Sequence, residues 1–506
     1  MAGQKSELND RWVVTEDGSA VDFTATLPPD PADMLKEIGA RLDGVHRLTD
    51  ARVAEAIEMV QAADLQGQDL VRELRTRFLA SGTDTESSDH VRIWEVISRY
   101  SSQLASAYVA LAQRFQTYAK GWVDAGDKLP MVVARAIRAT SSRMTWQRMG
   151  YRPVDADIWQ TLSQLLSYAE DKGLLSAQVL VYEDKSTFQR EFVKPLMLTM
   201  SAVDNLPPVE VDIAASVIAY FAERFELQSY PTQSCYFMVN VDQWTPAARY
   251  RSGEPVRLGS RFFGPGDAIS EIEKLSARLA EGAHSANQIK LHEFADIETV
   301  VGVLAHLERH WTNTRPERRE VRRDSLSEIA VILGFGEIVN SIERKYLSVK
   351  DDEEEEFETW AVENESEGGY GTVLPAERGK KLHVGELIAI RTPGSCVWGV
   401  GVIRRLLAVQ DVARRYVGIQ MLARGIQVVQ LMNAETSERM GTGLLLPSHV
   451  GDSAGKRDIN LLLPAGGFSP DFNVEMWVYD KRYLLEPQIA LETGDDFVVA
   501  RFGVQA

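Results

Sequence analysis

The sequence has little cysteine, no excess of basic charge and no long apolar run. Its only cysteines are Cys235 and Cys396, and neither belongs to a CxxC pair. This excludes a disulfide framework or a cysteine-bound zinc, and it fits a reducing compartment. No run approaches the ~18 apolar residues of a membrane span, and the first residues lack the apolar segment of a secretory signal. We therefore expect a soluble, cytoplasmic protein without membrane insertion.

Positive charge is scarce relative to negative charge. The chain of 506 residues has 55 Lys and Arg against 73 Asp and Glu, a formal net charge of −18. Long-range repulsion would oppose nucleic acid as a general partner, and equally a surface of anionic lipid. With 44% apolar residues, the chain can still build packed cores, and its length indicates about three domains.

Motifs of known catalytic sites are also missing. The sequence contains no GxxxxGK[ST], HExxH, GxSxG or EF-hand loop. His306 and His310 stand four apart on a predicted helix and could share a metal, but a solvated helix end is the favoured interpretation. We expect no enzymatic activity, no metal and no cofactor. An enzyme with its site near Cys235 or the histidine pair is a less favoured alternative.

Apolar spacing divides the chain into regions. A leader, 1–30, precedes a helical bundle predicted over 31–178, where Leu35, Ile38 and Leu42 follow the three- and four-residue spacing of a helix. Such a bundle could also mediate homo-oligomerisation. Region 179–312 mixes strand-like and helical segments and predicts an α/β middle domain.

The C-terminal part is rich in short strands. Runs of apolar or alternating residues separated by Gly, Pro, Asn and Asp predict β-barrel or sandwich structure from about 313 to the end. This exceeds the length of a small barrel, so we expect one β-barrel over 313–423 and an additional β-rich module over 424–506. The fold class is therefore multidomain α+β.

One segment contradicts the acidic background. Five arginines lie within nine residues, directly before a predicted strand at 327–333: Arg315, Arg318, Arg319, Arg322 and Arg323. Such a cluster is either a solvated linker balanced by carboxylates or a site for an anion. The planar guanidinium can bind phosphate in a bidentate manner, stack on a base and grip the O6/N7 edge of guanine.

A polar motif follows on a later predicted strand. Asn364 and Ser366 stand two apart, so on an extended chain their side chains point to the same side. Gly369 then permits a turn and the close approach of a ligand. Further strand-like segments follow at 384–391, 397–405 and 416–422.

Together, in this order, these segments resemble the PilZ domain, a small bacterial β-barrel that binds cyclic di-GMP. That family carries an RxxxR motif before its first strand and a [D/N]xSxxG motif later, which Asn364, Ser366 and Gly369 match. Two arginine registers are possible, Arg318 with Arg322 or Arg319 with Arg323. The second lies nearer the strand and is slightly preferred. The resemblance covers about 315–422.

The resemblance implies a non-enzymatic cyclic di-GMP receptor that relays ligand binding to an unidentified protein partner. The arginine pair would contact phosphates and guanine edges, Asn364 and Ser366 would hydrogen-bond guanine, and Gly369 would keep the turn open. One departure is the long gap between the two motifs, whose excess runs from Gly336 to about Phe357 and includes six carboxylates at 351–356. An acidic loop could compete for the arginines, so a structural protein with a degenerate PilZ-like domain is the alternative.

Overall fold

A computed structural model describes residues 13–14, 20–21, 30–47, 53–81, 88–117, 126–281, 296–314, 322–347, 357–379, 382–409, 413–447, 458–478 and 481–505. The chain divides into two compact units, Met1–Pro316 and Glu317–Ala506. Arg315, Arg318, Arg319 and the carboxylate run 351–356 lie outside the described residues. In the predicted leader, β1 (Val13–Val14) pairs with β2 (Ala20–Val21).

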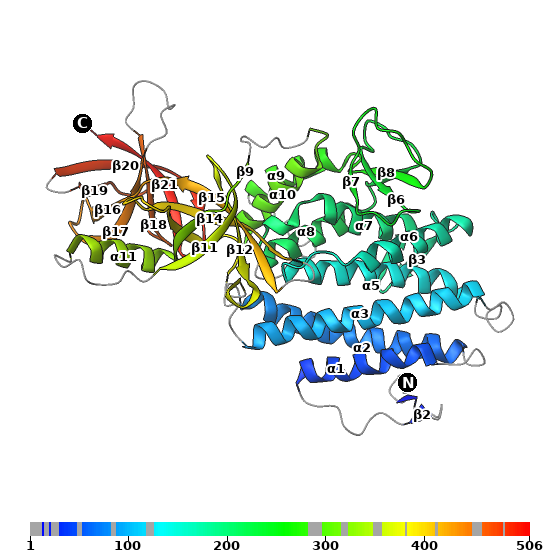
Figure 1. Cartoon of the computed structure of the whole chain (residues 1–506). Coiled ribbons are helices and arrows are strands. Elements are labelled where there is room, and N and C mark those ends of the chain that lie inside the picture. The colour runs from blue at the N-terminus through cyan, green and yellow to red at the C-terminus, as the bar shows by residue number, and fades with distance from the viewer. Residues whose placement is uncertain are drawn as a thin grey trace, which may run out of the picture. The chain divides into compact units, whose positions relative to one another are not determined.

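Helices make up the first part of unit 1, as the apolar spacing predicted. They are α1 (Pro31–Leu42), α2 (Val53–Ala80), α3 (Ser88–Thr117), α5 (Leu129–Met149) and α6 (Ala156–Asp171), with short 3-10 turns at Asp43–Arg47 and Gly126–Lys128. Asp30 caps α1 by accepting a hydrogen bond from the Ala32 amide, and Pro31 occupies the first helical position. Figure 1 shows the long helices lying side by side.

The rest of unit 1 mixes small antiparallel sheets with helices, which confirms the predicted mixed character. Its elements are β3 (Gln178–Val181), β4 (Asp184–Thr187), α7 (Phe188–Met200), η4 (Val203–Asn205), α8 (Pro208–Tyr220), β5 (Glu226–Gln228), β6 (Phe237–Asn240), β7 (Ala248–Arg249), β8 (Ser260–Gly264), α9 (Ala268–Ala280) and α10 (Ile297–Trp311). Strands β3 and β4 form a hairpin, and the other four form a sheet in the order β5-β8-β6-β7.

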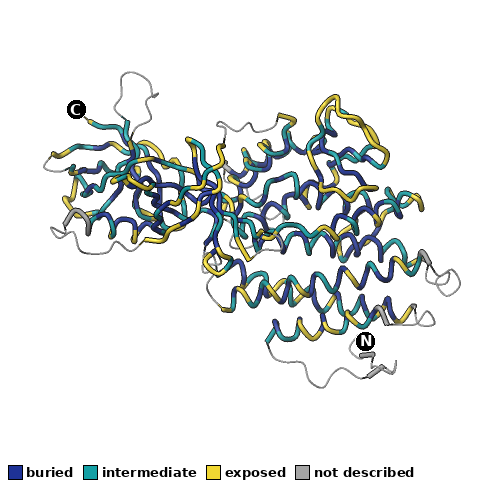
Figure 2. Tube along the Cα trace, viewed as in Figure 1, coloured by how far each residue is buried: buried dark blue, intermediate teal, exposed yellow. Residues whose placement is uncertain are grey.

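A single hydrophobic core runs through unit 1, from Ala32 on α1 to Trp311 on α10. The boundary expected between 178 and 179 therefore lies inside one compact unit. Figure 2 shows the buried faces of the long helices turned toward one another, with exposed residues on their outer sides. Among the described residues, no helix combines the length and apolarity that crossing a bilayer would require.

Unit 2 begins with the predicted barrel. Its elements are β9 (Arg323–Asp324), β10 (Glu328–Leu333), α11 (Phe335–Leu347), β11 (Glu358–Ser366), β12 (Gly369–Pro375), α12 (Ala376–Gly379), β13 (Leu387–Arg391), β14 (Gly399–Ala408) and β15 (Arg414–Ala423). The sheet order is β10-β13-β14-β15-β12-β11-β9, and pairing of β10 with β11 closes the ring. Closure leaves β9 as a short extra strand on β11.

Helix α11 occupies part of the segment where the sequence indicated an insertion. It starts directly after β10, and the amide of Phe335 donates to the Asp496 carboxylate at 2.6 Å. Ile338 and Ile342 are buried in a core that also contains residues of β13, β14 and the following strands. The segment before 348 is therefore a packed helix that belongs to the body of unit 2.

The predicted additional β-rich module is a second closed barrel. Its strands are β16 (Gln427–Asn433), β17 (Arg439–Leu446), β18 (Asp458–Pro464), β19 (Val474–Val478), β20 (Lys481–Thr493) and β21 (Phe497–Gln505), in the order β16-β17-β18-β21-β20-β19. Val400 of the first barrel, Ile338 of α11 and Leu444 of the second barrel share one core. The two barrels are thus packed together in unit 2.

Candidate functional site

A β-bulge sets the direction of the NxSxxG motif on β11. Trp360 and Val362 alternate as buried residues, at 1% and 3% exposure, and a regular strand would continue that side at Asn364. The register with β12 shifts between Val362 and Asn364, which pairs with Gly371. A bulge adds one residue and so reverses which side the following residues face. Asn364 and Ser366 therefore leave the core side and lie half-buried at the barrel surface.

Arg322 meets Asn364 on this surface. Its Nη1 donates to Oδ1 of Asn364 at 3.0 Å and to the hydroxyl of Tyr416, on β15, at 2.6 Å. Arg322 is exposed, and it directly precedes β9, whose pairing with β11 holds Arg322 beside the motif. One predicted arginine and one predicted motif residue are thus brought together by direct contact.

Arg323 lies in β9 and is exposed. It belongs, with Arg319, to the register that the sequence slightly preferred. It pairs along the backbone with Glu365, and among the described residues its side chain has no hydrogen-bond partner. The geometry therefore favours the register that contains Arg322. Its companion Arg318 follows shortly after the boundary between the two units, outside the described residues.

Gly369 starts β12 where that strand pairs with β15. A Cβ at this position would lie 2.0 Å from the carbonyl oxygen of Ile419, which is backbone and cannot turn away. The glycine thus permits close approach of two strands. At Gly371 a Cβ would instead meet the side chains of Tyr416 and Asn364, at 2.5 and 2.6 Å.

Arg424 fixes the turn between Ser366 and Gly369. Its Nη2 donates to the carbonyl oxygens of Ser366, at 3.0 Å, and Glu367, at 2.6 Å, and its Nη1 reaches the Tyr370 hydroxyl at 3.3 Å. These bonds satisfy backbone carbonyls at the hairpin tip and hold the motif in one shape.

Sequence reasoning missed Tyr416 and Arg424 as site residues. Tyr416, Gly418 and Gln420 alternate along β15, and this period of two was a usable signal that they share one face. Nothing in the local sequence around Arg424 indicates that its side chain reaches a turn almost sixty residues earlier.

The histidine pair on α10 lies against the core of unit 1. Nε2 of His306 is 2.7 Å from the carbonyl oxygen of Ser201, and the two imidazole rings are 4.5 Å apart. Burial lowers the pKa of His310 to about 4, with further lowering by His306 and Arg309. Within the described ranges, no three His, Cys, Asp or Glu side chains gather as metal ligands. The pair therefore has a packing role here, in place of the solvated helix end that was expected.

Cys235 is buried, and its burial raises the thiol pKa, which disfavours the reactive thiolate.

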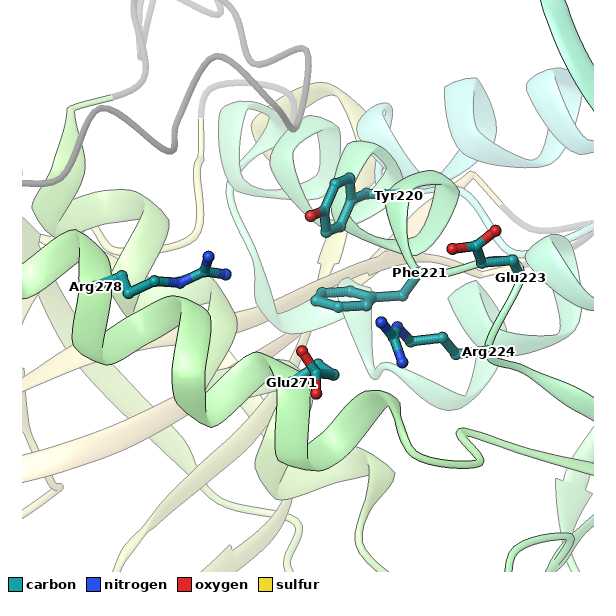
Figure 3. A pocket seen from close by; sticks show the side chains of 6 residues that line it. All are labelled: Tyr220, Phe221, Glu223, Arg224, Glu271 and Arg278. Atoms are coloured by element: carbon teal, nitrogen blue, oxygen red, sulfur yellow. The ribbon is translucent and has the colours of Figure 1, made fainter.

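A small surface pocket, drawn in Figure 3, is lined by Tyr220, Phe221, Glu223, Arg224, Glu271 and Arg278. Arg224 is paired with Asp267 at 2.7 Å, and Glu271 with Lys274 at 2.8 Å. Local charges thus satisfy one another, and the pocket offers no excess charge of either sign to a ligand.

The first barrel of unit 2 is a PilZ-type domain. Residues 337–427 match the family model described as the middle PilZ domain of the cyclic-di-GMP receptor FimW. This range contains Asn364, Ser366 and Gly369 and begins after the arginine segment. The resemblance to PilZ proteins is confirmed by this match.

Unit 1 provides a second match. Residues 19–232 match the model described as the N-terminal domain of the same cyclic-di-GMP receptor, FimW. The two models together cover more than half of the chain, which is thus similar to FimW both in its helical part and in its barrel. Both descriptions name a receptor, and neither names an enzyme. No curated protein matches the chain.

Proposed function

We propose that this protein is a non-enzymatic receptor for cyclic di-GMP and that the ligand binds on the first barrel at Arg322, Asn364 and Ser366. Arg318 would complete the RxxxR pair. The observation that supports this proposal is the contact of Arg322 with Asn364, which places a guanidinium beside an amide at the barrel surface. Guanidinium groups bind phosphate and the O6/N7 edge of guanine, and an amide can hydrogen-bond a base edge.

Arg322 is held by Asn364 and Tyr416. A dinucleotide phosphate would replace these neutral acceptors with an ionised one, which a guanidinium can bind through two parallel hydrogen bonds. Such an exchange removes only side-chain contacts of Arg322 and leaves the strand pairing of the barrel intact.

We further propose that ligand binding is relayed to a protein partner. In the sequence, the arginine segment lies at the boundary between Met1–Pro316 and Glu317–Ala506, so a ligand that holds Arg318 and Arg322 together would constrain the chain at this boundary. The size of such a switch is limited by the difference in ligand affinity between the two arrangements. Light scattering with and without ligand would also test whether unit 1 mediates homo-oligomerisation.

Calorimetric titration of the full chain with cyclic di-GMP tests the proposal. We expect saturable binding that is lost in the double variant Arg318→Ala with Arg322→Ala while the circular dichroism spectrum is unchanged. A wild-type protein that gives no binding at tens of micromolar ligand would contradict it. That result would instead favour the second candidate, a structural protein in which the bonds of Arg322 to Asn364 and Tyr416 serve only to fix β9 on the barrel.

A further inference from the structure

A second arginine, Arg404, contacts β15, the strand that also carries Tyr416, a contact partner of Arg322. Nε of Arg404, on β14, donates to Oε1 of Gln420 at 2.8 Å. Gln420 and Tyr416 are four residues apart on β15, and the register of β15 with β12 is regular between them. They therefore share one face of the strand, with Cα atoms about 13 Å apart. Arg322 and Arg404 are thus anchored at two points of one surface.

The backbone pairing places Arg404 next to the end of the NxSxxG motif. Gln420 pairs with Gly369, and Gly369 pairs across the hairpin with Ser366. One row of paired residues therefore leads from Ser366 through Gly369 to Gln420 and its bound arginine. A ligand that contacts Ser366 at the hairpin end would lie within reach of a side chain held at Gln420.

A bulge on β14 explains why Arg404 reaches this position. The register with β15 shifts between Ile403, which pairs with Ile419, and Arg405, which pairs with Gly418, so Arg404 is the extra residue. Ile403 is fully buried, whereas the Arg404 side chain is 37% exposed. Bulges commonly redirect a side chain near a binding site.

The C-terminal barrel holds the other side of this guanidinium. Nη2 of Arg404 lies 2.7 Å from Oε1 and 2.8 Å from Oε2 of Glu492, on β20. Both side chains are partly buried, at 37% and 27% exposure, which favours one conformation over the many of a free arginine. Among the described residues Nη1 has no hydrogen-bond partner, so its two N–H groups remain for an acceptor.

We propose that Arg404 is a second ligand-binding arginine and that Glu492 is its positioning residue, so that the C-terminal barrel completes the ligand site of the first barrel. This inference rests on the proposed function. The group that Arg404 binds is an acceptor edge of the dinucleotide, either a phosphodiester or the O6/N7 edge of guanine. A cyclic dinucleotide carries two of each, which suits two separated arginines on one face.

The test is calorimetric titration of the full chain and its variants with cyclic di-GMP. We expect Arg404→Ala to weaken binding about tenfold or more, the usual effect of losing a hydrogen bond to a charged group. Arg404→Lys keeps the charge without the fork and should recover part of the affinity. The matched control is Arg439→Ala, an exposed arginine of the C-terminal barrel that donates to Gln430, and it should bind as wild type does.

Glu492 is tested by a double-mutant cycle. Glu492→Ala should weaken binding several-fold in the wild-type background and have no further effect in the Arg404→Ala background. A carboxylate that only stabilises the fold would lower the unfolding midpoint of the Glu492→Ala variant and leave its ligand affinity unchanged. Tighter binding by Glu492→Ala would show that the carboxylate competes with the ligand and would overturn the positioning role.

Competition with cyclic di-AMP separates the two acceptor groups. If Arg404 binds guanine, Arg404→Ala loses discrimination between the two dinucleotides; if it binds phosphate, the affinity for both falls by the same factor. If Arg322→Ala weakens binding but Arg404→Ala does not, the role of Arg404 is excluded and the proposed function still stands. Both proposals fail if the wild-type protein binds no cyclic di-GMP.

Discussion

Arg322 donates a hydrogen bond to Asn364 at 3.0 Å, although 42 positions separate the two residues in the chain. The contact depends on β9, which pairs with the end of β11, and on the bulge that turns Asn364 outward. It links the two short motifs by direct contact. The relative position of Arg322 and Asn364 thus follows from the protein's own strand pairing, and a site held in this way has a lower ordering cost on ligand binding.

The first prediction separates the two arginine registers. Arg322→Ala should weaken cyclic di-GMP binding about tenfold or more, because it removes the guanidinium that lies against Asn364. Arg323→Ala should have a smaller effect, because that side chain is exposed and lies on a strand whose contact with β11 is through the backbone. Calorimetry on the two single variants measures the difference. A larger loss in Arg323→Ala would restore the Arg319/Arg323 register.

The second prediction concerns Gly369. Gly369→Ala should lower the stability of unit 2 by at least about 1–3 kcal/mol, since the added methyl group would collide with the Ile419 carbonyl of the neighbouring strand. Urea unfolding followed by tryptophan fluorescence measures the loss. Gly336→Ala on α11 is the matched control, because nothing lies within 4 Å of its Cβ position and alanine favours the helix.

Gly371→Ala gives a contrasting result two residues away. There the new methyl group would meet the ends of the Tyr416 and Asn364 side chains, which can move. We expect a smaller loss of stability than for Gly369→Ala and a clear loss of ligand affinity, because both side chains must leave Arg322. Equal stability and wild-type affinity in Gly371→Ala would show that ligand binding does not use this arrangement.

The third prediction concerns a buried carboxylate in unit 1. Asp64 is fully buried and accepts hydrogen bonds from Tyr108 at 2.6 Å, Tyr182 at 2.8 Å, Gln68 at 3.0 Å and Arg135 at 3.2 Å. Asp64→Ala would leave a buried guanidinium without its carboxylate, which typically costs about 3–5 kcal/mol.

Urea unfolding followed by the helical circular dichroism signal measures the effect of Asp64→Ala. Asp69→Ala, on the same helix, is the control, since Asp69 and its partner Arg72 are 78% and 71% exposed. Exposed pairs contribute at most about 1 kcal/mol. If the two variants unfold at similar urea concentrations, the buried network does not stabilise unit 1.

The fourth prediction is a pH dependence in unit 2. Nε2 of His383 lies 3.0 Å from Oδ2 of Asp495, and Glu386 and Asp496 are also near. Burial alone would lower the pKa of His383, but the bond to Asp495 and the negative charges of Glu386, Asp495 and Asp496 raise it overall. A raised pKa in the folded state stabilises the fold below the ordinary histidine range, and this stabilisation is lost as pH rises through the folded value.

Unfolding in urea at pH 6 and pH 8 tests this dependence. The wild type should lose more stability between the two pH values than His383→Gln, which cannot take up the proton. Identical losses in the two proteins would exclude His383 as the source, because the other carboxylates of the cluster are present in both.

Several features could be predicted from the sequence for physical reasons. The helical region follows from the spacing of Leu35, Ile38 and Leu42, which defines one apolar face whatever packs against it. The PilZ-type barrel could be recognised because its motif residues lie close together at Asn364, Ser366 and Gly369. The additional β-rich module over 424–506 followed from strand density and length, whereas its closure into a barrel is a finding of the structure.

Other features depend on contacts between distant parts of the chain. A change of apolar spacing near 178 cannot show whether the core is interrupted there, and in the structure one core continues through this point to Trp311. Helix α11 was treated as inserted loop, although its apolar face fills a core shared by both barrels. Arg424 and Glu492 gain their roles only where separate strands meet.

Residue types and their short-range spacing were sufficient to identify a barrel of the PilZ type and a local excess of arginine in a chain of net charge −18. The choice of Arg322 over Arg323 as the neighbour of Asn364 came from the three-dimensional arrangement. A one-residue bulge reverses which side a strand residue faces, and the energy that selects the bulge lies in pairing with other strands. The local excess of positive charge is therefore evident in the sequence, whereas the contact of Arg322 with Asn364 depends on the pairing of β9 with β11 in the sheet.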